Sequence, residues 1–127
     1  MHKPGTIYLS MFLSLISINT AADPGLYGIY SNLSAYAGHH SGMEIFILND
    51  GRPGKCQQSV LFQVAEGSPQ YPELLDCCTC SVSHITFKSK KWGDFIGRID
   101  NNSLVGEFID SKLKIELKKG LSYWQKQ

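Results

Sequence analysis

The amino-acid sequence predicts an all-β protein, an antiparallel meander of about seven to nine short strands closed into a small barrel. Three observations lead to this fold class. Short apolar runs of strand length alternate with clusters of Gly, Pro, Asn and Asp, which are the residues that form turns. The last third of the chain alternates apolar and polar side chains with the period of a strand. Beyond the N-terminal segment no apolar stripe extends over several helical turns, and a meander protects its free edges best by closing.

The first half of the chain contains three expected strands. Residues 26–33 follow Pro24-Gly25 and form the first, and residues 42–48 form the second. A turn is expected over residues 49–54, because Gly and Asn tolerate positive φ and Pro presets φ. Residues 56–65 then form a third strand that pairs with the second as a hairpin.

The second half predicts about four or five further strands. Residues 74–81 and 82–88 give either one long strand or two short ones. Residues 95–100 and 104–110 flank an Asn-rich tight turn, which is typical of a hairpin. Residues 113–118 alternate apolar and charged side chains, so that one face of this strand is buried and the other is in water.

Two glycines lie inside these strand patterns, Gly97 and Gly106. A glycine in a strand usually marks a bulge, a sharp bend or a close approach of another backbone. Bends of this kind let a small sheet close into a barrel. The interior of an eight-stranded barrel is filled by its own side chains or holds one small ligand, and the sequence leaves these two possibilities open.

Residues 1–22 have the layout of a secretory signal peptide. Lys3 gives the N-terminus a positive charge, and residues 9–18 form a short apolar run. A membrane anchor needs about 20 apolar residues, roughly twice the length of this run. We therefore expect cleavage after Ala22, export to a periplasmic or extracellular space, a single β domain over residues 23–127, and no stable membrane insertion after cleavage.

The charge balance argues against nucleic acid as a partner. The chain has 12 Lys and Arg residues against 11 Asp and Glu residues, and loss of Lys3 with the leader makes the two equal. Proteins that bind phosphate backbones cluster positive charge instead. A catalytic set is not recognisable either, because Ser31, Ser34 and Ser59 lack a nucleophile elbow and no histidine has a recognisable relation to them. We therefore expect a protein that is not an enzyme.

The four cysteines are candidates for disulfides or for metal chemistry. Cys56 begins a predicted strand, and Cys77, Cys78 and Cys80 form a cluster. In an exported chain all four are disulfide candidates, and a bridge from Cys56 to the cluster is worth about 3 kcal/mol. The remaining pair forms a tight link or stays as thiols. The alternative is a zinc or copper site, or a redox-active thiol, built from the cluster and His84.

Aromatic and histidine side chains are the candidates for a binding surface. Tyr and Trp combine a large apolar body with a polar tip and are enriched in binding patches. A glycine-flanked loop is expected to carry two of the histidines, and loops of this kind often bind ligands. Two large aromatic residues close to the C-terminus indicate that the tail docks onto the sheet. The candidate binding residues are Tyr30, Tyr36, His39, His40, Trp92, Tyr123 and Trp124.

Several segments carry a resemblance to known proteins, namely Gly28-Ile29-Tyr30-Ser31-Asn32, Gly42-Met43-Glu44-Ile45, residues 62–67, residues 104–108 and the closing Ser122-Tyr123-Trp124-Gln125. They resemble a family of small exported, mainly bacterial, β-rich proteins of unassigned function. The resemblance implies an exported β domain and names no chemistry, and the cysteine cluster departs from it. Residues 95–108 are also similar to the meander hairpins of lipocalin-like barrels, which implies that fold and no particular ligand.

The sequence thus favours an exported, non-catalytic binding module without a cofactor. Its partner would be a protein, such as a target enzyme, or a small ligand, held by the loops at one end of the barrel. The alternative is a metal-binding or thiol-redox protein that uses Cys77, Cys78, Cys80 and His84 with zinc or copper.

Overall fold

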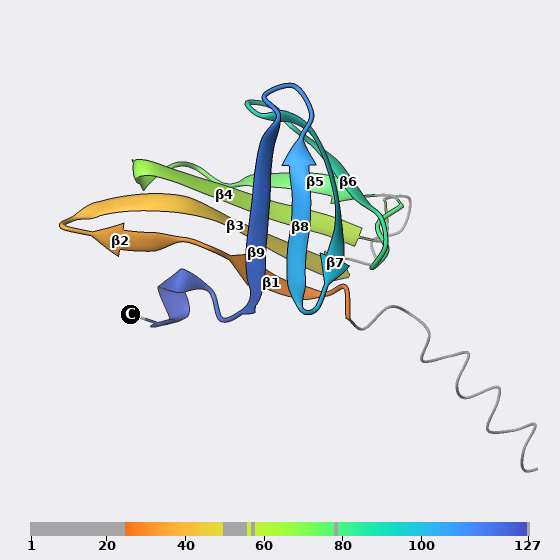
Figure 1. The fold of residues 1–127 in the computed structure, drawn as a ribbon, viewed down its shortest axis with the longest axis horizontal. Helices are drawn as coiled ribbons and strands as arrows, with labels where there is room; N and C mark the ends of the chain where they lie inside the picture. Colours follow the sequence, from red (N-terminus) through yellow and green to blue (C-terminus); the bar gives the residue numbers. More distant parts are fainter. Residues whose placement is uncertain (1–24, 50–55, 57, 78, 127) are drawn as a thin grey trace, which may run out of the picture.

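The computed structural model describes residues 25–49, 56, 58–77 and 79–126. The predicted leader, residues 1–22, and the predicted disulfide residue Cys78 lie outside this part of the chain. The described residues form strands and one short 3-10 helix, η1 (Figure 1). The elements are β1 (Gly28–Ser31), β2 (Ser34–Tyr36), β3 (His39–Asn49), β4 (Gln58–Pro69), β5 (Glu73–Cys77), β6 (Ile85–Ser89), β7 (Gly93–Asp100), β8 (Ser103–Phe108), β9 (Leu113–Gly120) and η1 (Tyr123–Lys126).

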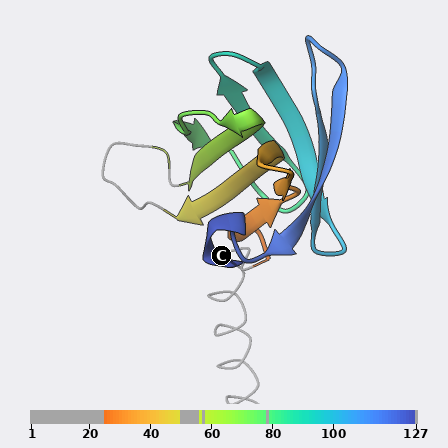
Figure 2. The same cartoon turned by 90° about the vertical axis from the view of Figure 1, so that its left-hand side faces the viewer.

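The strands form one curled antiparallel sheet. Eight of them lie in the order β5-β4-β3-β1-β9-β8-β7-β6, and β2 pairs with β3. Because β1 pairs with both β3 and β9, the two halves of the chain join into one wall that turns back on itself (Figure 2). The outer strands β5 and β6 come to lie side by side without a ladder between them. The predicted fold class is confirmed as an antiparallel meander nearly closed into a barrel.

Local sequence explains the tight turns. Asn101 and Asn102, between β7 and β8, have φ of 50° and 62°, and two positive φ values are typical of a type I′ hairpin turn. The predicted Asn-rich turn is therefore confirmed. A second turn of this kind, Ala37-Gly38 with φ of 52° and 83°, joins β2 to β3. The expected loop around His39 is wrong, because this residue is paired within the β2–β3 hairpin.

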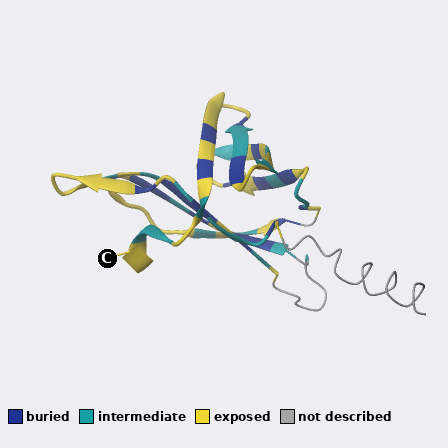
Figure 3. Ribbon diagram, turned by 60° about the horizontal axis from the view of Figure 1, so that its bottom comes forward, coloured by how far each residue is buried: buried dark blue, intermediate teal, exposed yellow. Residues whose placement is uncertain are grey.

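The interior of the barrel is filled by side chains. Buried and exposed residues alternate along the strands (Figure 3), as the predicted period of two requires. Aromatic rings occupy the centre of the core, and the rings of Phe87 and Phe95 stack with centroids 4.8 Å apart. The sequence left open whether the interior is filled by side chains or holds a ligand, and in the structure side chains fill it. The fully buried side chains include Tyr30, Ile45, Ile47, Val60, Phe62, Ile85, Phe95, Leu104, Phe108 and Leu117.

Gly97 and Gly106 make room for one of these rings. The two glycines are direct partners in the β7–β8 ladder. A Cβ atom on Gly97 would lie 2.8 Å from the Phe95 ring and 2.7 Å from the Val105 carbonyl oxygen, and a Cβ atom on Gly106 would overlap the same ring. The predicted close approach is confirmed, and its cause is an aromatic ring that covers two adjacent strands.

Candidate functional site

The Ser-Tyr-Trp-Gln motif forms a reciprocal cap on η1. The Ser122 hydroxyl accepts a hydrogen bond from the backbone N–H of Trp124 at 3.2 Å. In return the backbone N–H of Ser122 donates to the Gln125 side-chain oxygen at 2.8 Å. This exchange is a capping box, in which two otherwise unpaired N–H groups of a helical turn are satisfied. Residues 121–126, called the tail below, therefore have a defined conformation.

Glu44 on β3 holds the tail against the sheet. Its carboxylate accepts hydrogen bonds from the Ser122 hydroxyl at 2.7 Å and from the Tyr123 backbone N–H at 2.6 Å. A third bond, 2.9 Å long, comes from the Ser31 hydroxyl on β1. Glu44 is only 8% exposed, so these charge-assisted bonds are strong ones. The predicted docking of the tail is confirmed.

Three of the predicted binding residues meet where the tail crosses β3 and β4. The ring of His40 lies 5.7 Å from the rings of both Tyr123 and Trp124. The rings of Tyr123 and Trp124 are 4.9 Å apart in an edge-to-face arrangement. The Trp124 indole N–H also donates to the Gln63 side-chain oxygen on β4 at 3.0 Å. The sequence-predicted aromatic residues at the C-terminus thus join His40 in one cluster.

A row of apolar side chains crosses the outer face of the sheet beside this cluster. Ile29 on β1 pairs with Phe46 on β3, Phe46 pairs with Leu61 on β4, and Leu61 pairs with Leu74 on β5. Tyr30, Ile45, Ile47, Val60 and Phe62, which flank them on β1, β3 and β4, are buried in the core, and Leu75 on β5 packs against it, so these four side chains point outward. Phe46, Leu61 and Leu74 are 38%, 37% and 59% exposed. Four strands therefore present a continuous apolar row, called the outer row below.

A groove of about 290 Å³ lies between the outer row and the tail. The polar groups at its edge are already paired. The Gln63 amide donates to the Gln70 carbonyl oxygen at 3.0 Å and accepts from Trp124, and Glu44 is engaged by the tail. An apolar pocket with few free polar groups suits apolar side chains. The groove is lined by Ile29, Glu44, Phe46, Leu61, Gln63, Pro72, Ser122, Trp124 and Gln125.

The remaining predicted binding residues lie elsewhere. Tyr30 belongs to the core rather than to the surface: it is fully buried, its hydroxyl donates to the Leu26 carbonyl oxygen at 2.8 Å, and burial raises the pKa of Tyr30 to about 12. Tyr36 and His39 flank the exposed turn at the tip of the β2–β3 hairpin (Figure 1). Trp92 packs partly against the core. Sequence reasoning therefore brought together residues that the fold separates.

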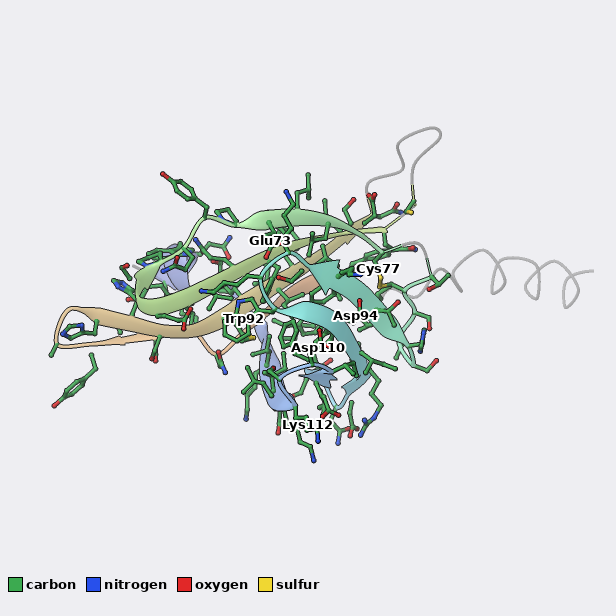
Figure 4. The ribbon with its side chains drawn as sticks, turned by 90° about the horizontal axis from the view of Figure 1, so that it is seen from above. Glu73, Cys77, Trp92, Asp94, Asp110 and Lys112 are labelled. Atoms are coloured by element: carbon green, nitrogen blue, oxygen red, sulfur yellow. A yellow bond between two sulfur atoms is a disulfide. The ribbon has the colours of Figure 1, made fainter. Side chains whose placement is uncertain are left out.

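The cysteines are paired where the structure describes them. Cys77 and Cys80 form a disulfide, and Cys56 is disulfide-bonded as well. Cys77, at the end of β5, is marked in Figure 4. His84 is exposed and its backbone bridges to Ser81. Among the described residues, no group of three His, Cys, Asp or Glu side chains is arranged to hold a metal ion.

Sequence reasoning missed the residues that build the groove. Glu44, Phe46, Leu61 and Gln63 were not among the predicted binding residues, and neither was Leu74, which completes the outer row. Their signal was available in the strand period, because Phe46 and Leu61 alternate with the core residues of their strands. Only the cross-strand register shows that they form one row.

Searches of protein-family models, of curated proteins and of solved structures find no match for this chain. The described residues include no helix that is both long and apolar enough to span a membrane.

Proposed function

We propose that this protein is an exported, non-catalytic binding module whose groove beside the tail holds apolar side chains of a protein partner. The observation that carries the proposal is the outer row, Ile29, Phe46, Leu61 and Leu74, which lies beside Trp124 of the docked tail. Aromatic and aliphatic side chains that are exposed together and held rigidly are typical of interaction sites. Export rests on the leader-like residues 1–22.

The dimensions of the row favour a protein over a small molecule. Neighbouring strands are about 4.8 Å apart, so the row from Ile29 to Leu74 extends over roughly 14 Å. The groove, at about 290 Å³, covers only part of that length. A small ligand in the groove would leave Leu74 in water, whereas a protein surface can cover the whole row. The filled interior also removes the support for a ligand inside the barrel.

The resemblance to small exported proteins of unassigned function remains a proposal, with one supporting contact. The two most distinctive motifs that carry it, Gly42-Met43-Glu44-Ile45 and Ser122-Tyr123-Trp124-Gln125, meet through the carboxylate of Glu44. Both motifs thus serve to dock the tail, and the docked Trp124 forms one wall of the groove.

We assign the Cys77–Cys80 disulfide a structural role. Both residues are buried in the core, where an attacking thiolate has little access to the sulfur atoms. Zinc or copper binding by the reduced cluster with His84 is the competing proposal.

The groove can be tested with a fragment that mimics one apolar side chain. N-acetyl-leucine methylamide is titrated into ¹⁵N-labelled protein, and we expect saturable shifts of the Trp124 indole N–H and of the Leu61 and Gln63 amides. Leu61→Asp should abolish these shifts. Leu113→Asp is the matched control, since Leu113 on β9 is 38% exposed and Leu61 is 37% exposed. Shifts that do not saturate, or that persist in Leu61→Asp, would contradict the proposal.

A further inference from the structure

Among the described strands, the barrel is open between β5 and β6. Each of these strands pairs with a single neighbour, β5 with β4 and β6 with β7. The two strands nevertheless lie side by side, so that two free edges face each other. We call the space between Glu73–Cys77 and Ile85–Ser89 the seam. Unpaired strand edges offer a row of backbone donors and acceptors to any chain that can pair with them.

Side chains close both ends of the seam. At one end the Glu73 carboxylate accepts hydrogen bonds from the Ser89 hydroxyl at 2.6 Å and from the Lys90 backbone N–H at 2.8 Å. At the other end the Cys77 sulfur lies 2.8 Å from the Thr86 carbonyl oxygen. Figure 4 marks Glu73 and Cys77 at the opposite ends of β5. Among the described residues, no backbone hydrogen bond joins β5 to β6 between these two ends.

The backbone of Lys88 faces this middle part. The Asp94 carbonyl accepts a hydrogen bond from Ile109 N–H at 2.9 Å, on the side of β7 away from β6. In a strand the peptide groups of successive residues point to alternate sides, so Phe95 faces β6 and exchanges hydrogen bonds with its partner Phe87. The next residue, Lys88, therefore directs its N–H and C=O toward β5. The contact of the Thr86 carbonyl with β5 follows the same alternation.

We propose that the seam is a strand-acceptor site, which takes up an extended segment of a partner polypeptide paired through the backbone of Lys88. The free groups at the edge are peptide N–H and C=O groups in strand geometry, and another extended peptide matches them best. This site is separate from the groove beside the tail and does not rest on the function proposed above.

The surface next to the seam indicates which segments fit. A second groove, of about 480 Å³, runs along β6 and reaches the end of β5. Thr86 and Lys88 line it from β6, Ile96 lines it from β7, and Ile109 adds a further exposed apolar side chain. An inserted strand would direct every second side chain toward this groove and the others toward the core. Asp76, Lys88 and Asp94 also line the groove, so we expect a segment in which apolar residues facing the core alternate with polar residues facing the groove.

Insertion requires β5 to move. A strand between β5 and β6 needs these two to be about 9.6 Å apart, twice the usual spacing. β5 has only five residues, and Leu74 and Asp76 face solvent. Glu73 holds the seam closed, so weakening its two hydrogen bonds should favour the open form.

The test compares proline and alanine at position 88. Ten-residue peptides selected from a phage-displayed library against the wild-type protein are measured by fluorescence anisotropy. Lys88→Pro removes the N–H at the seam, and an edge strand tolerates proline where that N–H faces outward. Lys88→Ala removes the same side chain and retains the N–H. We expect Lys88→Pro to bind at least about tenfold more weakly than Lys88→Ala.

Two further variants make the result decisive. Glu73→Gln should bind the selected peptides a few times more tightly than the wild type, because a neutral amide holds Ser89 and Lys90 less firmly. Glu116→Ala, at an exposed position on β9 away from both grooves, should leave peptide binding unchanged. Circular dichroism and a melting curve establish that Lys88→Pro is folded. The proposal is overturned if no peptide is selected, if the protein pairs only with itself, or if the proline and alanine variants bind equally.

Discussion

Replacement of Glu44 by alanine should release the tail while the barrel stays folded. The carboxylate accepts two hydrogen bonds from the tail, from Ser122 and Tyr123, and one from Ser31. Alanine removes the two oxygen atoms that accept all three bonds, at a position that is 8% exposed. The Tyr123 N–H would then have to find water, and the capped turn would lose its attachment to β3.

The expected size of the effect follows from these contacts. A hydrogen bond to a charged group contributes about 1.5 to 3 kcal/mol. The tail is partly exposed, so the lower value applies to its two bonds, and their loss weakens docking by about 3 kcal/mol. A change of 3 kcal/mol is roughly a 100-fold change in the population of the undocked tail. The barrel strands do not depend on these bonds, so the change is local.

Amide hydrogen exchange at Tyr123 measures this population directly. We expect Glu44→Ala to exchange roughly 100-fold faster than the wild type at this amide, with little change at core amides such as that of Ile45. Glu44→Gln keeps one oxygen acceptor and should give an intermediate rate. Glu116→Ala, an exposed residue on β9, is the control and should leave the rate unchanged. An unchanged rate at Tyr123 in Glu44→Ala would refute the role assigned to Glu44.

Three further predictions concern the core. In urea unfolding, Gly106→Ala should lower the free energy of unfolding by about 2 to 3 kcal/mol, because the added Cβ overlaps the Phe95 ring. Gly120→Ala is the control and should be nearly neutral, because no atom lies within 4 Å of its added Cβ. Burial raises the pKa of Tyr30 from 10.0 to about 12, so the unfolded chain loses this proton first. The stability of the wild type relative to Tyr30→Phe should therefore be constant below about pH 9 and fall by about 2 kcal/mol by pH 12, and a constant difference would contradict this. Replacing Cys77 and Cys80 together by alanine should lower the melting temperature by an amount equivalent to about 2 kcal/mol, and zinc should not stabilise the reduced wild type, whereas tight stoichiometric zinc binding would favour the metal alternative.

The sequence predicted the barrel strands well because their signals are local. The alternation over residues 113–118 and the Asn101-Asn102 turn both appear in the structure as expected. Strand β2 was missed for the same reason, since its three residues are all exposed and carry no apolar alternation. The two histidines next to it were therefore placed in a loop.

The candidate site was harder to predict, because it depends on which strands are neighbours. Phe46 and Leu61 are unremarkable in sequence, and only the β3–β4 register places them side by side. Tyr30 shows a different error, because it was predicted to be a binding residue and is fully buried in the core. As a tyrosine it is equally typical of a surface or of a core, and burial with a hydroxyl donated to Leu26 decides between them.

Photo-crosslinking tests the proposed protein interaction most directly. A benzoylphenylalanine replaces Leu61 in the groove or, as the control, the equally exposed Leu113 on β9, in the organism that makes the protein. The binding proposal predicts one discrete crosslinked species when the crosslinker is at position 61, and no such species when it is at position 113. The absence of any adduct from position 61, or the same adducts from both positions, would contradict it.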